Sequence, residues 1–170
     1  MNDFNDKFNS ITDLGFPFKD FIDMLNEIIM QLKIELPARP NSISISDMEA
    51  KVFEISKNIS ILLSLKLLLK SATERCREIH IEMQNKAIVR AKEILISGIP
   101  IDDVPIRGGR SKLLQIKVDK EFSVYEYDNR YRTLKVLVSM VEDFVTFNIS
   151  ARRVVKGYLT RKEEDKGSLD

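Results

Sequence analysis

The amino-acid sequence predicts a mainly α-helical fold, built as a long helical hairpin or bundle that assembles into a homo-oligomer. Only six Gly and five Pro occur among 170 residues, and most of them cluster, which leaves long uninterrupted segments for helix. Apolar residues recur in these segments at spacings of three and four, which is the helical period. The apolar content of 44% excludes wholesale disorder, and the length fits one domain with an additional arm.

The first segment is an acidic arm in which we expect one helix. Seven acidic and three basic side chains give residues 1–36 a net charge of 3 − 7 = −4. From about residue 18 to 34 the apolar residues follow the period of an amphipathic helix. Pro37 and Pro40 remove amide donors and disfavour helix at the residues before them. We therefore interpret residues 37–46 as a linker.

The core domain, residues 47–162, is expected to begin with a helix of about 50 residues. Ser46 or Asp47 can cap it, since Glu49 lies where a capping box requires it, and neither Gly nor Pro occurs before Gly98. Two seven-residue series mark a packing seam along this helix, the first apolar throughout and the second polar in its later half. They are Met48, Ile55, Leu62, Leu69, Cys76 and Met83, and Val52, Ile59, Lys66, Thr73, His80 and Ala87.

The stretch 61–69 within this helix is apolar almost all round, so other helices or other subunits must cover it. An oligomer would supply that cover, and its expected interface residues are Leu62, Leu63, Leu65 and Leu69. The same stretch contains Lys66 and is too short to span a bilayer, so no membrane association is expected. With a single Cys and no basic-then-apolar leader, the sequence indicates a cytoplasmic protein, in the host cytoplasm if it is viral.

Three further segments complete the chain. Residues 97–112 contain three Gly and two Pro and are expected to form a basic loop. The β-branched and aromatic residues of 113–127 favour a small β-hairpin, with a short helix as the alternative. Helical spacing returns over 128–162, and the tail 163–170 is charged and expected to fray. The inward-facing candidates of the last helix are Tyr131, Leu134, Val138, Val141, Phe144, Val145, Ile149, Val155 and Leu159.

The sequence lacks the residue sets that most catalytic sites require. One Cys and one His cannot form a zinc site, and Cys76 with His80 lacks a third residue to orient the base. We interpret Cys76 as a core residue and His80 as a polar residue of the seam. The Gly108–Gly109 pair lies among basic residues but does not match the G-x-x-x-x-G-K-[ST] motif of nucleotide-binding loops. The prediction is a non-enzymatic protein without a cofactor, with either an anion-contacting or a merely flexible basic loop.

Charge is sorted along the chain although the net charge is only +1. Residues 61–118 carry eleven bases and six acids, a balance of +5, and residues 150–160 add three bases and no acid. Such surfaces attract phosphate backbones, and interleaved tyrosines such as Tyr125, Tyr127 and Tyr131 can stack on bases. Ordinary solvated helix faces are the alternative. The candidate nucleic-acid-binding residues are Lys86, Arg90, Lys92, Arg107, Arg110, Lys112, Arg152, Arg153 and Lys156.

The order of these segments resembles the UvsY-type recombination mediators of bacteriophages over roughly residues 50–160. The matching features are a K-A-x-x-R-A-K segment (Lys86, Ala87, Arg90, Ala91, Lys92), Ser97–Gly98, V-D-K-E at 118–121, Tyr131, and Ser150, Arg152 and Arg153. The resemblance implies a helical oligomer that binds single-stranded DNA and helps a RecA-like recombinase displace the single-strand-binding protein. It also implies that Lys86, Arg90 and Lys92 contact DNA. The longer amino terminus and the 97–112 loop have no counterpart in that pattern.

The sequence thus supports two functional hypotheses. The first is a single-stranded DNA-binding mediator of recombination or repair whose partners are a RecA-like recombinase and the single-strand-binding protein. The second is a helical structural or adaptor protein, such as a virion or assembly component, whose basic residues serve only salt bridges and solubility.

Overall fold

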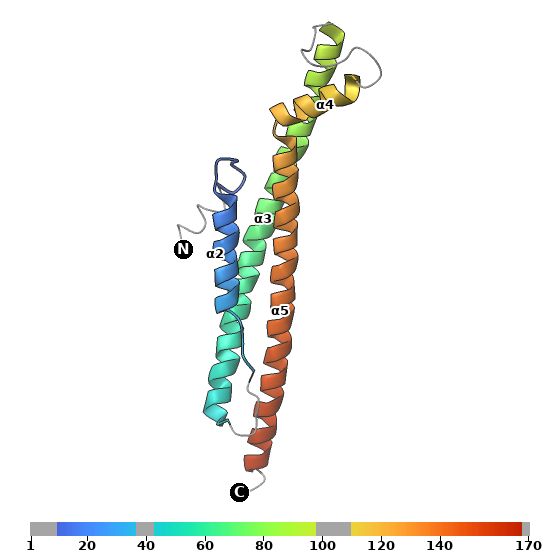
Figure 1. The fold of residues 1–170 in the computed structure, drawn as a ribbon. Coiled ribbons are helices and arrows are strands. Elements are labelled where there is room, and N and C mark those ends of the chain that lie inside the picture. Colours follow the sequence, from blue (N-terminus) through green and yellow to red (C-terminus); the bar gives the residue numbers. More distant parts are fainter. Residues whose placement is uncertain (1–9, 37–42, 98–109, 168–170) are drawn as a thin grey trace. The chain divides into compact units, whose positions relative to one another are not determined.

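The computed structural model describes residues 10–36, 43–97 and 110–167 (Figure 1). Within these ranges the chain forms four helices and no strand, which confirms the predicted mainly α fold. The helices are α2 (Phe18–Gln31), α3 (Ile45–Ser97), α4 (Arg110–Glu121) and α5 (Val124–Gly167). Most of the expected linker, at 37–42, and most of the expected loop, at 98–109, lie outside the described residues.

The small β-hairpin predicted near 113–127 is wrong and the alternative, a short helix, is confirmed, because this stretch forms most of α4 and the beginning of α5. Leu114 and Val118 lie four residues apart and are both 1% exposed, so α4 buries one helical face instead of alternating residues. Both pack in a cluster with Ala87 and Ala91 of α3. Ser123, at a φ of 54°, provides the left-handed residue that separates α4 from α5. These contacts override the local preference for strand.

The contacts divide the chain into two compact units, which we describe separately. The first unit comprises Met1–Pro17 and Lys70–Val136, and the second comprises Phe18–Leu69 and Leu137–Asp170. The long helices α3 and α5 contribute residues to both units. The segment expected to be one acidic arm, 1–36, is divided between the two.

In the first unit, Arg130 of α5 holds the segment that precedes α2. Its side chain is buried, with 8% exposed for the residue. The guanidinium donates hydrogen bonds to the carbonyl oxygens of Ile11 (2.8 Å), Leu14 (3.0 Å), Phe16 (3.1 Å) and Asp13. Ile11 is itself fully buried, so the segment also removes apolar surface from water. One arginine thereby links a segment of the amino terminus to a helix more than a hundred residues later in the chain.

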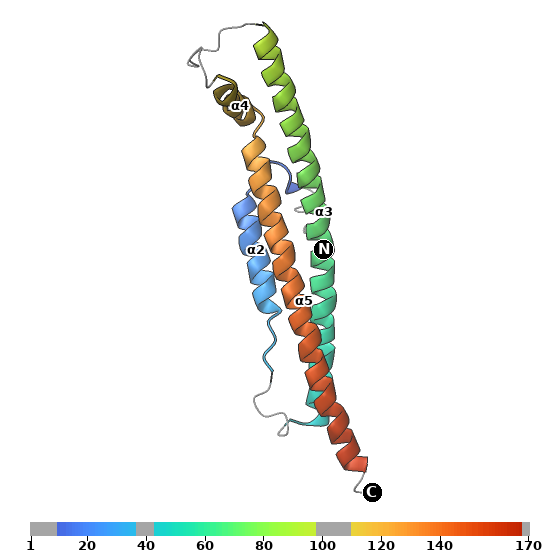
Figure 2. The same ribbon diagram turned by 90° about the vertical axis from the view of Figure 1, so that its right-hand side faces the viewer.

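The second unit is a bundle of α2, the first part of α3 and the later part of α5, which Figures 1 and 2 show side by side. The predicted amphipathic helix is confirmed, since α2 buries Phe21, Leu25 and Ile29. Asn58 of α3 donates a hydrogen bond from Nδ2 to the carbonyl oxygen of Leu32 (3.3 Å) just after α2 ends. A second set of buried residues joins the beginning of α3 to the end of α5: Ile34, Met48, Ile55, Ile59, Ala151 and Val155.

Helix α3 confirms the prediction of one long helix, but its cap lies two residues earlier than expected. Ser44 is the cap: its Oγ accepts a hydrogen bond from the amide of Asp47 (3.1 Å), and its hydroxyl donates to Asp47 Oδ2 (2.6 Å). The apolar seam series is confirmed, since its first five members, from Met48 to Cys76, are at most 2% exposed. Ser44 and Asp47 therefore form the capping pair that the sequence led us to assign to Ser46 and Glu49.

Helix α5 begins at Val124 and extends to Gly167, beyond the predicted end at residue 162. Most of the expected inward-facing residues are buried or half-buried, including Leu134, Val141 and Val145. Ile149 is an exception at 38% exposed, because the fully buried Asn148 occupies the inward position instead. Asn148 Nδ2 donates to the carbonyl oxygen of Phe144 (2.9 Å), while its Oδ1 has no hydrogen-bond partner in the described part of the chain.

Candidate nucleic-acid interface

The structure places the expected basic residues in two separate groups. Lys86, Arg90, Lys92 and Lys112 are exposed in the first unit, on α3 and α4. In the second unit, on α5, Arg153 and Lys156 are exposed and Arg152 is half-buried. Arg107 lies outside the described residues, and Arg110 begins α4 with a side chain that is likewise not described.

The first group includes an open groove of about 430 Å³ on α3 beside the end of α4. Lys86 and Arg90 line it together with Val89 and Phe122, whereas Lys92 does not. This arrangement follows from helical spacing. Lys86 and Arg90 are four residues apart and share one face of α3, whereas Lys92, two residues after Arg90, lies on another face. The structure thus brings two of the three residues implied by the resemblance into one groove and leaves the third outside it.

Acidic side chains neutralise this first groove. Lys86 Nζ lies 2.6 Å from Glu82 Oε1, and Arg90 Nη1 lies 3.5 Å from Glu93 Oε2. Both carboxylates also line the groove, so its two positive charges are balanced by two negative ones. Exposed ion pairs contribute only about 0–1 kcal/mol, so a phosphate can exchange for a carboxylate. The electrostatic attraction for a polyanion is nevertheless weak here.

A second groove, of about 360 Å³, lies along α5 in the second unit. Arg153, Gly157 and Arg161 recur every four residues, so they form one stripe, and Val154 and Tyr158 complete the lining. No carboxylate lines this groove, and neither arginine has an ion-pair partner in the ranges that the structure describes. Its two guanidinium groups therefore remain available to an anionic ligand.

Gly157 keeps the centre of this second groove open. A Cβ built at this position meets no atom within 4 Å, so the helix backbone is accessible between the two arginines. A planar group can approach the helix there more closely than at any residue with a side chain. The half-buried Tyr158 beside it supplies an aromatic ring.

Sequence reasoning did not place Tyr158, Arg161 or Phe122 in these grooves. The spacing of Arg161 from Arg153 is visible in the sequence as two steps of four, and this signal could have identified it. Phe122 gave no such signal, because its position depends on the turn at Ser123. The tyrosines expected to stack on bases, Tyr125, Tyr127 and Tyr131, line neither groove.

Three of the four residues expected at an oligomer interface are covered within the chain itself. Leu62, Leu65 and Leu69 are at most 3% exposed, and Leu63 alone is open to solvent, at 43%. Packing in the bundle therefore accounts for much of the apolar character of 61–69 that the sequence led us to attribute to other subunits.

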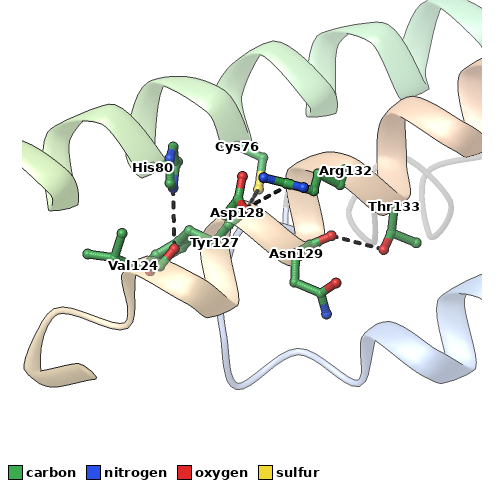
Figure 3. A network of polar contacts seen from close by, with 8 residues as sticks. All are labelled: Cys76, His80, Val124, Tyr127, Asp128, Asn129, Arg132 and Thr133. Carbon is green, nitrogen blue, oxygen red and sulfur yellow. Dashed lines mark hydrogen bonds and ion pairs between the residues drawn. The ribbon is translucent and has the colours of Figure 1, made fainter. Parts of the chain in front are cut away.

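Cys76 and His80 lie against the beginning of α5 in the first unit (Figure 3). His80 Nδ1 lies 3.3 Å from the carbonyl oxygen of Val124, and Cys76 Sγ lies 3.7 Å from that of Tyr127. Burial raises the pKa of the Cys76 thiol, and the positive charge of Arg130 opposes this rise. A thiol in this environment is protonated and inert, which agrees with the interpretation of Cys76 as a core residue.

Two further features bear on the kind of site that the chain can hold. In the ranges that the structure describes, no three His, Cys, Asp or Glu side chains come together as a metal ion would need. None of the described helices is both long and apolar enough to cross a bilayer.

Comparisons of the chain with protein-family models, curated protein sequences and solved structures find no significant match.

Proposed function

We propose that this protein binds single-stranded DNA, with the groove along α5 as the principal contact. The observation that carries the proposal is the stripe of Arg153, Gly157 and Arg161 with Tyr158 beside it, lined by two cations and no acid. Guanidinium groups bind phosphate through paired N–H donors, and an aromatic ring stacks on any base. Binding of this kind is tolerant of sequence and sensitive to salt.

The open form of the groove favours a polymer over a small molecule. Arg153 and Arg161 are separated by eight residues, or roughly 12 Å along the helix axis. An extended strand that lies along the groove would therefore place separate phosphates near the two guanidinium groups. Lys156, exposed on the same helix, is a secondary contact of this unit. The groove at Lys86 and Arg90 is a separate candidate contact of the first unit.

The biological role that we propose is that of a non-enzymatic mediator, which assists loading of a RecA-like recombinase onto DNA covered by single-strand-binding protein. This part rests on the resemblance of residues 50–160 to UvsY-type mediators and on the basic groove. It predicts that the protein shortens the lag before a RecA-like recombinase hydrolyses ATP on coated single-stranded DNA. An unchanged lag, with DNA binding intact, would leave a DNA-binding protein without the mediator role.

The binding step is tested by fluorescence anisotropy with a labelled oligo-dT strand at low and physiological salt. The double variant Arg153→Glu/Arg161→Glu is expected to lower affinity at least tenfold. Loss of two phosphate contacts should also reduce the slope of log K against log salt by about 1.4. The matched control is Lys19→Glu/Lys33→Glu, which makes the same charge change at two exposed lysines elsewhere in the second unit.

Equal losses in the two double variants would mean that only net charge matters, and would contradict the assignment of the groove. A third variant, Lys86→Glu/Arg90→Glu, tests the first groove. Because Glu82 and Glu93 already balance its charge, we expect this variant to lower affinity less than the change at Arg153 and Arg161.

The alternative function, a helical adaptor or structural protein, is favoured by a different surface. Ile81, Ile88 and Leu95 recur every seven residues on α3, and are 44%, 38% and 50% exposed. Heptad spacing of exposed apolar residues is typical of a face that packs against another helix. If oligo-dT does not bind even at low salt, this surface becomes the better guide to function.

A further inference from the structure

The outward face of α3 in the second unit carries two large apolar side chains that are mostly exposed. Phe53 is 73% exposed and Leu67 is 69% exposed. The two residues lie fourteen positions apart, or roughly 21 Å along the helix. Burial of these two side chains against another surface would remove their apolar area from water and stabilise the pair.

Between these two residues the face is made of serines whose hydroxyl groups are already hydrogen-bonded. Ser56, Ser60 and Ser64 each donate to the carbonyl oxygen four residues earlier, at 2.7, 3.2 and 3.1 Å. Covering these hydroxyls therefore leaves no donor without a partner. Their small size also lets a second helix approach closely. The face can be buried without a desolvation penalty from its polar groups.

Few charged groups lie in this part of the helix. Between Phe53 and Leu67 the sequence has only Glu54, Lys57 and Lys66, and Glu54 is paired with Lys51 at 2.8 Å. Lys66 is engaged on the other side of the helix, where its Nζ lies 3.0 Å from Glu142 Oε1. Lys57 lies three residues before Ser60, at the edge of the face, and its apolar stem can cover a neighbouring helix while the ammonium stays in water.

The face is symmetric about Ser60. Phe53 precedes it by seven residues and Leu67 follows it by seven, while Ser56 and Ser64 precede and follow it by four. If a second copy of α3 packs antiparallel with Ser60 on the twofold axis, Phe53 of each copy meets Leu67 of the other. A twofold interface requires this self-complementarity, in which residue i contacts j and j contacts i. Heptad spacing suits the shallow crossing that keeps two helices in contact over this length.

We propose that the protein forms a twofold dimer through this face of α3, with the two copies of α3 antiparallel and crossing at Ser60. The occupant of the face is a second copy of the chain, because only an identical surface matches its symmetry without further assumption. The proposal is independent of nucleic-acid binding, since none of these residues lines either basic groove.

Disulfide trapping tests the geometry in a Cys76→Ala background, which removes the native thiol. Ser60→Cys places identical residues on the axis, within the Cα separation of less than 7 Å that a disulfide needs, so it should cross-link two copies under mild oxidation. Ser56→Cys alone should not cross-link, because its expected partner is residue 64 of the other copy. The double variant Ser56→Cys/Ser64→Cys should cross-link again.

Equal cross-linking of Ser60→Cys and Ser56→Cys would indicate a parallel pair and overturn the proposed arrangement. Sedimentation equilibrium of the protein without added cysteines provides the second measurement. Leu67→Lys should raise the dimer dissociation constant at least tenfold with helical content unchanged. Met30→Lys, at a residue 64% exposed on α2, is the matched control and should leave the constant unchanged. A protein that is monomeric throughout the micromolar range would refute the proposal.

Discussion

Replacement of Arg130 by Met should release the segment before α2 from the first unit. Met keeps much of the apolar stem but removes the guanidinium, which donates to four backbone carbonyl groups between Ile11 and Phe16. Those carbonyl groups belong to a segment with little regular structure of its own, so Arg130 supplies hydrogen bonds that a helix would otherwise provide. The effect should therefore be concentrated in that segment.

The change in the free energy of unfolding follows from the hydrogen bonds that the variant loses and the desolvation cost that it avoids. Four hydrogen bonds at a net of about 0.5–1.5 kcal/mol each give a loss of about 2–6 kcal/mol. Removal of a buried charge recovers part of this, because the guanidinium no longer has to be desolvated. If the segment detaches, its carbonyl groups regain water but the burial of Ile11 is lost, worth about 1.5–3 kcal/mol. We expect a net decrease of about 2–4 kcal/mol in the free energy of unfolding.

Urea unfolding followed by circular dichroism measures the total effect, and amide hydrogen exchange of residues 10–17 measures the local one. The matched control is Arg132→Met, two residues later on the same helix. Its side chain is 75% exposed and its Nε lies 2.8 Å from Asp128 Oδ2, so it should lose less than about 0.5 kcal/mol. If both variants lose the same stability, or if exchange at 10–17 is unchanged, Arg130 does not hold the segment as described.

Three further predictions concern stability. Ser123→Gly should raise the free energy of unfolding by about 0.5–1 kcal/mol, because a φ of 54° strains a residue with a Cβ; no gain in urea midpoint would contradict this. Gly157→Ala should raise the free energy of unfolding by a similar amount, measured by thermal unfolding, because a Cβ at this position meets no atom within 4 Å. Burial raises the pKa of the Cys76 thiol in the folded protein above 9.0, the ordinary thiol value. The stability that goes with the protonated thiol is therefore fully present below pH 9.0, and it is lost as the pH rises through the pKa of the folded protein. Cys76→Ala should therefore lose less stability than the native protein between pH 8 and pH 10 in urea titrations.

Much of the fold could be predicted because it depends on long-range periodicity. The seam series from Met48 to Cys76 identified the buried face of α3, and the absence of Gly and Pro identified its length. The sequence alone does not determine where the helix begins, because Ser44 with Asp47 and Ser46 with Glu49 both match a capping box. Local pattern cannot choose between such pairs when the decision depends on which flanking residue is buried.

The failures occurred where tertiary contacts decide the outcome. The stretch 113–127 has strand-forming residues, yet Leu114 and Val118 are fixed as a helix by packing against Ala87 and Ala91. For Leu62 the sequence predicts burial, but it does not show that helices of the same chain, and not another subunit, bury this side chain. Arg153 was expected in the candidate site, whereas Tyr158 was not, because only the structure shows which neighbours face the same groove.

Asn148 leaves the second unit with stability that a single substitution could add. The residue is fully buried, and its Nδ2 bonds within α5 while its Oδ1 has no partner in the described chain. A buried oxygen without a hydrogen bond costs about 1–3 kcal/mol, and the native packing already bears this cost. An apolar side chain of similar volume would remove the unpartnered oxygen while it fills the same space between the helices.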